Sequence, residues 1–350
     1  NLDKAYKLKP YSPVVRFAYG YYYYGCFKDY YNALEHFKYA LLKEPGKAEY
    51  NQYIGYVHRR LGNWDEMLHY FEKSLVLNPN DMSLRLNLID TYIFLRQYNK
   101  VNFIDYDKRW YKISPDDPWL YSNRAVQTFT LEGKTDNARQ IINEASKLMP
   151  DHDYYKYPIM WFDEYDQKYD NALQYTQNSK DTIEYHQDQI VTKSGELSRI
   201  YWLMDKKDQS KKEAQKALEQ LHALPDLEGD PRYHVYLGRI YAILGNLEKA
   251  VLEAKMAKEL YPNTKDAFAS YDFDIQIAKI YAIIGKHKIA LDIIERLLIG
   301  PSTSKWWTIK YNSILNKIFK EDPRFKRIIK KDEEKFRREI TIDISNYLPN

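Results

Sequence analysis

The sequence predicts an all-α fold, a solenoid of about eight helical hairpins followed by a C-terminal helical cap. Small residues, aromatic residues and prolines return at fixed offsets along the chain, which is typical of stacked helical repeats. The composition agrees with this pattern. The 350 residues contain 12 Gly and 14 Pro against 35 Tyr, which suits helices joined by short turns better than a glycine-rich α/β enzyme.

The clearest unit spans residues 231–262. Gly238 is small where we expect the two helices of a hairpin to cross, and Tyr241 is large where the next hairpin packs. Gly245 is expected to end the first helix, because glycine adopts a left-handed conformation at little cost. Pro262 is expected to end the second helix, which proline cannot extend. The unit therefore predicts one helix–turn–helix hairpin.

The same spacing recurs along the chain. Three further units match it closely, at residues 48–79, 119–150 and from Tyr271 onward. Four weaker units fill the gaps, at residues 14–45, 82–115, 159–172 and 197–214. The sequence therefore predicts a repeat array over residues 11–301.

Both ends depart from the array. Ala5 and Pro10 have the spacing of the end of a unit, so we expect residues 1–10 to be the last part of a preceding repeat in a longer protein. Residues 302–350 leave the repeat pattern, and we expect capping helices and a basic tail there. Trp306, Ile314 and Phe325 are the expected anchors of this cap.

This spacing resembles the tetratricopeptide (TPR) repeat. The resemblance implies a right-handed α–α superhelix whose first helices line a concave groove. Residues 20–45, 53–81 and 318–329 are also similar to TPR arrays of bacterial signalling proteins, where the array is fused to adenylate cyclase, kinase, winged-helix or lipoprotein-like sensor domains. That similarity implies that the array is the regulatory part of a larger bacterial signalling protein.

Composition narrows the remaining possibilities. The net charge is only +4, and the single cysteine, Cys26, excludes a disulfide within the chain and a multi-cysteine zinc site. No run of 18 apolar residues is present, so we expect no membrane span. A soluble domain is expected, with the cytoplasm and the periplasm both left open, as is the oligomeric state.

Catalytic motifs are not found. The HExxH, GxSxG and GxGxxG patterns do not occur in the sequence. Asp163, Glu164 and Asp166 form a carboxylate group, which we interpret as a solvated helix face. We therefore predict no catalytic residue, no metal ligand and no cofactor, and expect that the chain is not an enzyme.

A peptide-binding groove is the site that the architecture favours. The positions expected to face it carry aromatic side chains near the N-terminus and basic ones later, which would stack on apolar groups and bind carboxylates. Two structural interpretations stay open: the tyrosines fill gaps between repeats, and the basic residues lie on a solvated face. The candidate residues are Tyr19, Tyr22, Tyr23, Tyr56, Arg59, Arg60, Trp161, Arg199, Trp202, Arg239 and Lys279.

The sequence therefore predicts a non-catalytic scaffold that binds a protein or peptide partner with an acidic segment. Recognition of chaperone tails is disfavoured, because Val15, Tyr19, Gln52 and Tyr56 stand where such clamps carry lysine and asparagine. The alternative is a nucleic-acid-associated module that stacks bases on tyrosine and uses the basic tail for phosphates. Nucleic acid is the weaker expectation, because acidic residues are interspersed in that tail.

Overall fold

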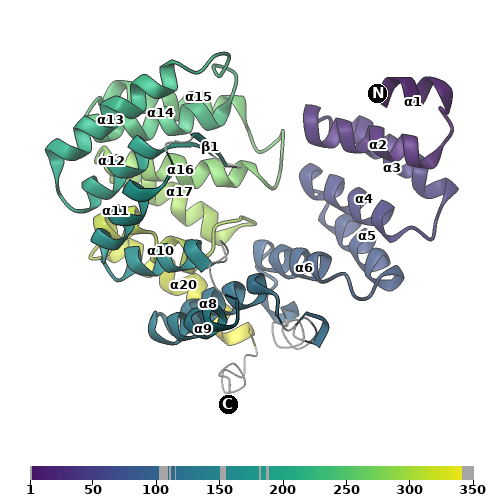
Figure 1. Cartoon of the computed structure of the whole chain (residues 1–350), viewed down its shortest axis with the longest axis horizontal. Helices are drawn as coiled ribbons and strands as arrows, with labels where there is room; N and C mark the ends of the chain where they lie inside the picture. Colours follow the sequence, from purple (N-terminus) through teal and green to yellow (C-terminus); the bar gives the residue numbers. More distant parts are fainter. Residues whose placement is uncertain are drawn as a thin grey trace. The chain divides into compact units, whose positions relative to one another are not determined.

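A computed structural model describes residues 2–101, 109, 112–114, 116–149, 155–180, 183–186 and 189–340. The chain divides into two compact units. The first unit comprises Asn1–Tyr92 together with Pro262–Ser270, and the second comprises Ile93–Tyr261 together with Tyr271–Asn350. Helices dominate both units, and Figure 1 labels them in chain order where there is room.

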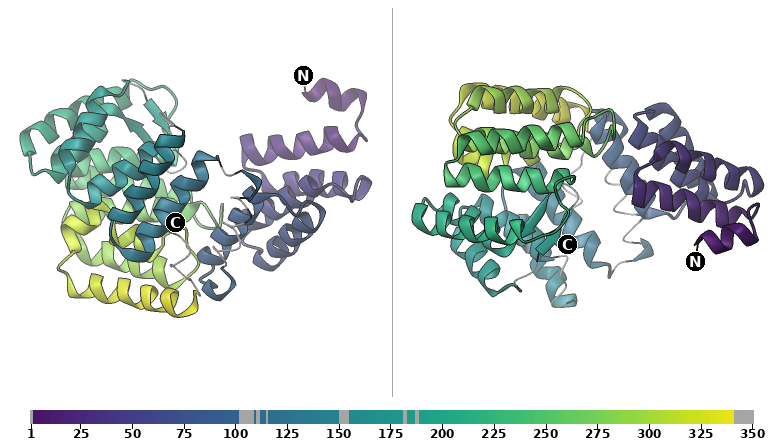
Figure 2. Two further views of the ribbon diagram at one scale, coloured as in Figure 1. Left: turned by 60° about the horizontal axis from the view of Figure 1, so that its bottom comes forward. Right: turned by 90° about the horizontal axis from the view of Figure 1, so that it is seen from above.

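The first unit consists of paired helices. Its elements are α1 (Leu2–Leu8), α2 (Pro13–Tyr22), a π-helical turn (Tyr23–Phe27), α3 (Tyr30–Lys43), α4 (Ala48–Leu61), α5 (Trp64–Leu77) and most of α6 (Met82–Phe94). Helices α2 and α3 form one hairpin and α4 and α5 another, as Figures 1 and 2 show. A Cβ atom on Gly20 would lie 2.6 Å from the Phe37 ring, and one on Gly55 would collide with Phe71. Small residues at these crossings let the paired helices approach closely.

The second unit repeats the hairpin. Its repeat helices are α8 (Pro118–Glu132), α9 (Asp136–Leu148), α10 (Lys156–Tyr165), α11 (Tyr169–Asn178), α12 (Lys193–Leu203), α13 (Lys207–His222), α14 (Pro231–Leu244), α15 (Leu247–Leu260), α16 (Ser270–Ile283) and α17 (His287–Ile299). A 3-10 turn, Tyr98–Lys100, precedes them. The second helix predicted within residues 82–115 lies largely outside the described residues.

Glycine ends the first helix in four of the hairpins. Their φ angles are positive, between +69° and +84°, at Gly62, Gly133, Gly245 and Gly285. The helix end predicted at Gly245 is therefore confirmed. Gly238 lies where three helices meet, because a Cβ there would be 2.8 Å from Ile280 on α16 and 3.4 Å from the Ala250 carbonyl oxygen on α15.

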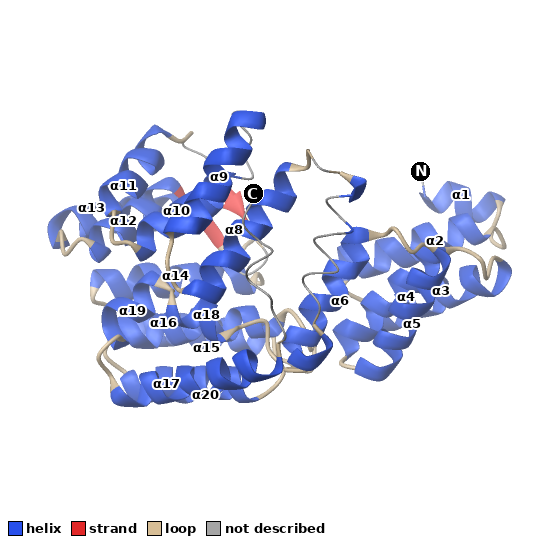
Figure 3. Cartoon of the chain, turned by 90° about the horizontal axis from the view of Figure 1, so that it is seen from below, coloured by secondary structure: helices blue, strands red, loops and turns tan. Residues whose placement is uncertain are grey.

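A short β-hairpin interrupts the helices, which the sequence pattern did not predict. Strands β1 (Ile183–Tyr185) and β2 (Ile190–Thr192) pair antiparallel, with Ile183 opposite Thr192. They are drawn in red in Figure 3. All three residues of β2 are buried, and the Tyr236 hydroxyl donates to the Thr192 carbonyl at 3.2 Å. The hairpin is thus packed against α12 and α14 as part of the second unit.

In the described part of the chain, three helices follow the last hairpin, α18 (Trp306–Lys310), α19 (Ser313–Phe319) and α20 (Pro323–Glu339). Helix α20 lies alongside α17 (Figure 3). Trp306, Ile314 and Phe325 are all buried, and Phe319 packs between Phe325 and His287, with ring centroids 5.7 and 5.1 Å away. Helix α20 thus covers α17 of the last repeat, whereas α18 packs on α20 and α19 lies against α12. The basic tail beyond residue 340 lies outside the described residues.

Candidate functional site

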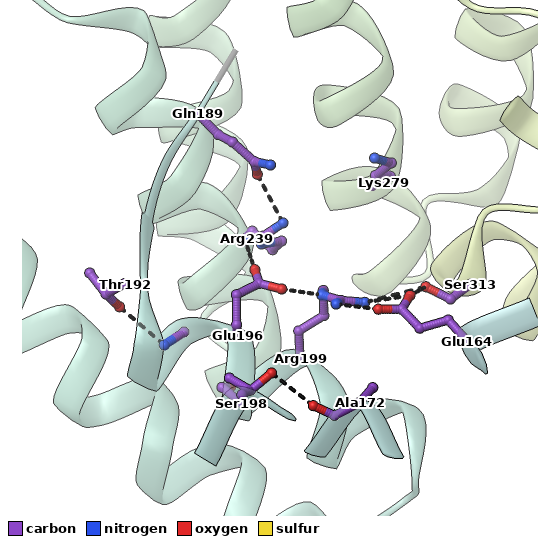
Figure 4. Close-up of polar contacts among 12 residues, drawn as sticks. Glu164, Ala172, Gln189, Thr192, Glu196, Ser198, Arg199, Arg239, Lys279 and Ser313 are labelled. Atoms are coloured by element: carbon purple, nitrogen blue, oxygen red, sulfur yellow. Dashed lines mark hydrogen bonds and ion pairs between the residues drawn. The ribbon is translucent and has the colours of Figure 1, made fainter. Parts of the chain in front are cut away.

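Arg199 on α12 lies among carboxylates of the second unit (Figure 4). Its guanidinium donates to both oxygens of Glu164 on α10, at 2.6 and 2.9 Å, and its Nε donates to Glu196 at 2.8 Å. The Ser313 hydroxyl donates to Glu164 at 2.7 Å. The side chain of Arg199 is only 12% exposed. All three nitrogens of this guanidinium therefore have partners within the chain.

Arg239 on α14 shares Glu196 with Arg199. It donates to Glu196 at 2.9 Å and to Gln189 at 3.0 Å, and its guanidinium lies 4.7 Å from the centre of the Tyr236 ring. We call the connected side chains the Arg199–Arg239 cluster: Glu164, Gln189, Glu196, Arg199, Arg239 and Ser313.

Charge is balanced within this cluster, because two arginines face two glutamates. Burial by itself raises the pKa of Glu196, but the attraction of Arg199 and Arg239 outweighs it and lowers the pKa to about 2. Glu164 and Glu196 hold the pKa of Arg199 well above its usual range despite burial. The prediction that Arg199 and Arg239 are an open basic end of a groove therefore needs correction, since their donors already serve this chain's own carboxylates.

The neighbouring carboxylates are also paired. Asp163 is buried and accepts from Arg139 at 2.7 Å, and Asp166 accepts from Arg139 at 2.9 Å and from the Thr135 hydroxyl at 2.8 Å. The interpretation of Asp163, Glu164 and Asp166 as a solvated face is therefore wrong. Asp163 and Asp166 thus link α10 to α9 of the preceding hairpin. The pairing also neutralises their charges, which burial would otherwise destabilise.

Arg60 on α4 lies among different partners, in the first unit. It donates to the Tyr24 hydroxyl at 3.1 Å and to Asp266 at 3.2 Å, and Tyr30 donates to the same oxygen of Asp266 at 2.7 Å. Asp266 is fully buried and belongs to the segment Pro262–Ser270, which follows α15 in the chain. A carboxylate far along the chain thus neutralises Arg60.

Arg59 lies beside Arg60 and contacts aromatic rings. Its guanidinium is 4.3 Å from the centre of the Phe268 ring and 5.0 Å from that of Tyr56, and it donates to Asn87 at 3.1 Å. These distances are typical of cation–π contacts. We call the connected residues the Arg59–Arg60 cluster: Tyr24, Tyr30, Tyr56, Arg59, Arg60, Asp266 and Phe268.

The surroundings of Asp266 favour its ionised form. Burial raises the pKa of its carboxyl, but Arg60, the backbone N–H groups of Ala269 and Phe268, and Tyr30 together lower it below its usual value. For Arg59 burial dominates and lowers the pKa of the guanidinium. The two arginines thus differ, since Arg60 has a buried carboxylate and Arg59 has mainly aromatic faces.

Three of the predicted tyrosines lie at the α1–α3 end of the first unit. The His36 ring stacks on Tyr19 and on Tyr23, with centroids 5.5 and 5.4 Å away, and the Tyr19 hydroxyl donates to Asp3. Tyr22 is 40% exposed and meets the edge of Phe27. Tyr19 and Tyr23 therefore fill space between helices, and Tyr22 retains an exposed face.

The remaining candidates pack within the second unit. Trp161 meets the edge of Phe129 at 4.9 Å, and Trp202 packs against the apolar core with Lys317 5.6 Å from its ring. Lys279 donates to Gln276 on its own helix at 3.2 Å.

Sequence reasoning missed Tyr24, Tyr30, Asp266 and Phe268. Glu196 could have been found, because it lies three residues before Arg199, a spacing that places two side chains together on a helix. No comparable signal pointed to Asp266, which is 206 residues from Arg60.

The residues that the structure describes indicate neither a metal site nor a membrane span. Among the described residues, no group of three or more His, Cys, Asp and Glu side chains is placed to hold a metal ion. None of the helices in this part of the chain combines the length and apolar character needed to cross a membrane.

Helical hairpins with small residues at their crossings and left-handed glycines at the ends of first helices define an all-α solenoid of TPR-like fold. No protein-family model and no curated protein sequence matches the chain. The structure of Naa15/Naa10 bound to HypK-THB is similar over 98% of this chain, with 13% identity and a TM-score of 0.29. The TPR domain of P58(IPK) is similar over 93%, with 12% identity and a TM-score of 0.24. The chain spans 61% of the matched Naa15/Naa10 chain and 98% of the P58(IPK) chain.

Proposed function

We propose that this chain is a non-catalytic repeat scaffold that binds a segment of a partner protein, and that the surface around Arg59 and Arg60 is its binding surface. One observation carries the proposal. Helix α4 holds residues 266–268 through a carboxylate, a main-chain N–H and an aromatic ring, which are the groups that a short protein segment offers.

The Arg199–Arg239 cluster is the weaker choice for this role. A partner's carboxylate would have to displace Glu164 or Glu196, each of which is held on a helix of the repeat array. The displaced glutamate would then be left partly buried without its cation, which is costly. The acidic segment of a partner is therefore better placed at Arg60, whose carboxylate comes from a linker.

Two further observations bear on the wider role. Within this proposal, the similarity of residues 20–45, 53–81 and 318–329 to bacterial signalling arrays favours a regulatory arm of a larger signalling protein.

Nucleic-acid binding is less favoured, because basic residues near the C-terminus pair with carboxylates. Arg324 lies 2.7 Å from Asp292, and Arg337 lies 2.9 Å from Glu333.

Cross-linking of captured partners tests the proposed surface. The full chain is used to capture proteins from a lysate of its source cells, and cross-linked residues are mapped by mass spectrometry. Wild type and an exposed-charge control, Lys38→Gln, are expected to capture the same protein with cross-links near α4. Arg59→Gln is expected to reduce capture about tenfold, since it removes the cation over the aromatic ring. Equal capture by all three proteins, with cross-links elsewhere, would contradict the proposal.

A further inference from the structure

The linker between α15 and α16 spans residues 261–269. Residues 262–270 belong to the first unit, although the helices on either side belong mainly to the second. The linker is therefore distinguished by the contacts that it makes with α4 and not by its length, since residues 223–230 between α13 and α14 are nearly as many.

Three consecutive residues make these contacts. Asp266 accepts from Arg60 and Tyr30 through one oxygen, and from the N–H groups of Phe268 and Ala269 through the other, at 3.0 and 2.8 Å. The Ala267 N–H donates to the Arg60 carbonyl at 2.8 Å, and the Phe268 ring lies against Arg59. The segment is a compact turn with the carboxylate inside and the aromatic ring two residues later.

Arg60 requires an anion in this position. Its side chain is only 17% exposed, so removing Asp266 without replacement would leave a largely buried cation unpaired. A competing ligand must therefore supply a carboxylate, and it gains further affinity from an aromatic ring over Arg59. A free acid without the ring would replace only part of these contacts.

We propose that residues 266–268 are a built-in competitor, and that a partner segment with an aspartate followed two residues later by an aromatic residue binds α4 by displacing them. This inference rests on the proposed function of the same surface. Because the segment is tethered at both ends, its effective concentration is on the order of millimolar, so it suppresses binding of weak ligands. Partner binding and release of the linker are thus coupled.

A labelled peptide with the sequence of residues 263–271 is the probe. Its binding to the full chain is measured by fluorescence anisotropy for wild type and for the double variant Asp266→Asn with Phe268→Ala. This variant removes the charge and the aromatic ring that the linker places against α4 and changes no residue of α4. The double variant is expected to bind the probe at least tenfold more tightly than wild type. Adding Arg60→Gln to the double variant, or replacing aspartate by asparagine in the probe, is expected to remove that gain.

Equally weak binding to wild type and to a double variant that melts like wild type would overturn the inference. If the double variant does not fold, amide hydrogen exchange of wild type is measured with and without excess probe instead. The probe is expected to accelerate exchange at residues 267 and 268, and unchanged exchange would overturn the inference. A dimer that the probe dissociates would also overturn it, because a second copy would then be the occupant. Failure of the probe alone, with partner capture still lost in Arg59→Gln, would leave the scaffold function standing.

Discussion

The Arg59–Arg60 cluster of the first unit and the Arg199–Arg239 cluster of the second unit both pair arginine with carboxylates. In the first, Arg60 pairs with the buried Asp266; in the second, both arginines contact the partly buried Glu196. The clusters differ in where the carboxylates come from. Glu164 and Glu196 belong to repeat helices α10 and α12, whereas Asp266 belongs to a linker. A carboxylate on a helix leaves only if the packing of that helix changes, but a linker can move while the helices stay folded. The two clusters therefore differ in how the counter-ion is held, by repeat helices around Arg199 and by a linker at Arg60.

The strongest test of this difference removes the cation of the second unit. Arg199→Met keeps side-chain volume but leaves Glu164 and Glu196 without a shared partner. We expect the free energy of unfolding to fall by about 3–5 kcal/mol, measured by urea unfolding followed by circular dichroism. Adding Glu164→Gln should recover part of the loss, since one of the unpaired charges is then removed. A loss below about 1 kcal/mol would mean that the network acts like a surface ion pair.

The pH dependence of stability tests the same network. The pKa of Glu196 is about 2 in the folded chain and 4.5 in the absence of structure, so its ionised form is stabilised by folding. Its contribution is fully present above about pH 4.5 and is lost as the pH falls toward 2, with a total on the order of 3 kcal/mol. Urea unfolding is measured between about pH 2.5 and about pH 5.5. Over this range the free energy of unfolding should depend less steeply on pH in Glu196→Gln than in wild type. The same slope in both proteins would place the stabilising charge elsewhere.

A smaller effect is expected in the first unit. Asp266→Asn keeps an oxygen that can accept from Tyr30 and Arg60 but removes the charge. We expect a loss of about 1–3 kcal/mol. Amide exchange should locate the loss at residues 266–269, with Glu259→Gln on the exposed face of α15 as the control. Loss of protection throughout α4 would contradict the view that the linker can leave while the helix stays folded.

The smallest effect is expected from Arg59→Met. Burial already disfavours the charge of Arg59, so the lost cation–π contact with Phe268 is partly offset by the removal of a buried cation. We expect a change within about 1 kcal/mol, measured by urea unfolding alongside Arg199→Met. A loss as large as that of Arg199→Met would make Arg59 a structural cation and remove the contrast between the clusters.

The hairpins themselves could be predicted from sequence because their determinants are local. Left-handed Gly62, Gly133, Gly245 and Gly285 occur at the same position of the repeat in four hairpins, and each marks the end of a first helix. The β-hairpin was missed because its strands contain three residues each, too few to establish a period.

The sequence by itself determined where small and large residues recur along the helices, and therefore that the chain folds into repeated helical hairpins. It also placed Arg59 and Arg60 next to each other on one helix. Only the tertiary structure decided which partner each of the predicted cations contacts. The partner of Arg60 is 206 residues away and lies outside the repeat period, so no pattern in the sequence encodes the contact. Glu164, the partner of Arg199 on α10, is likewise brought close by the stacking of hairpins. A helical period predicts which side chains are neighbours within one helix, but not which charged side chain of another helix will face them.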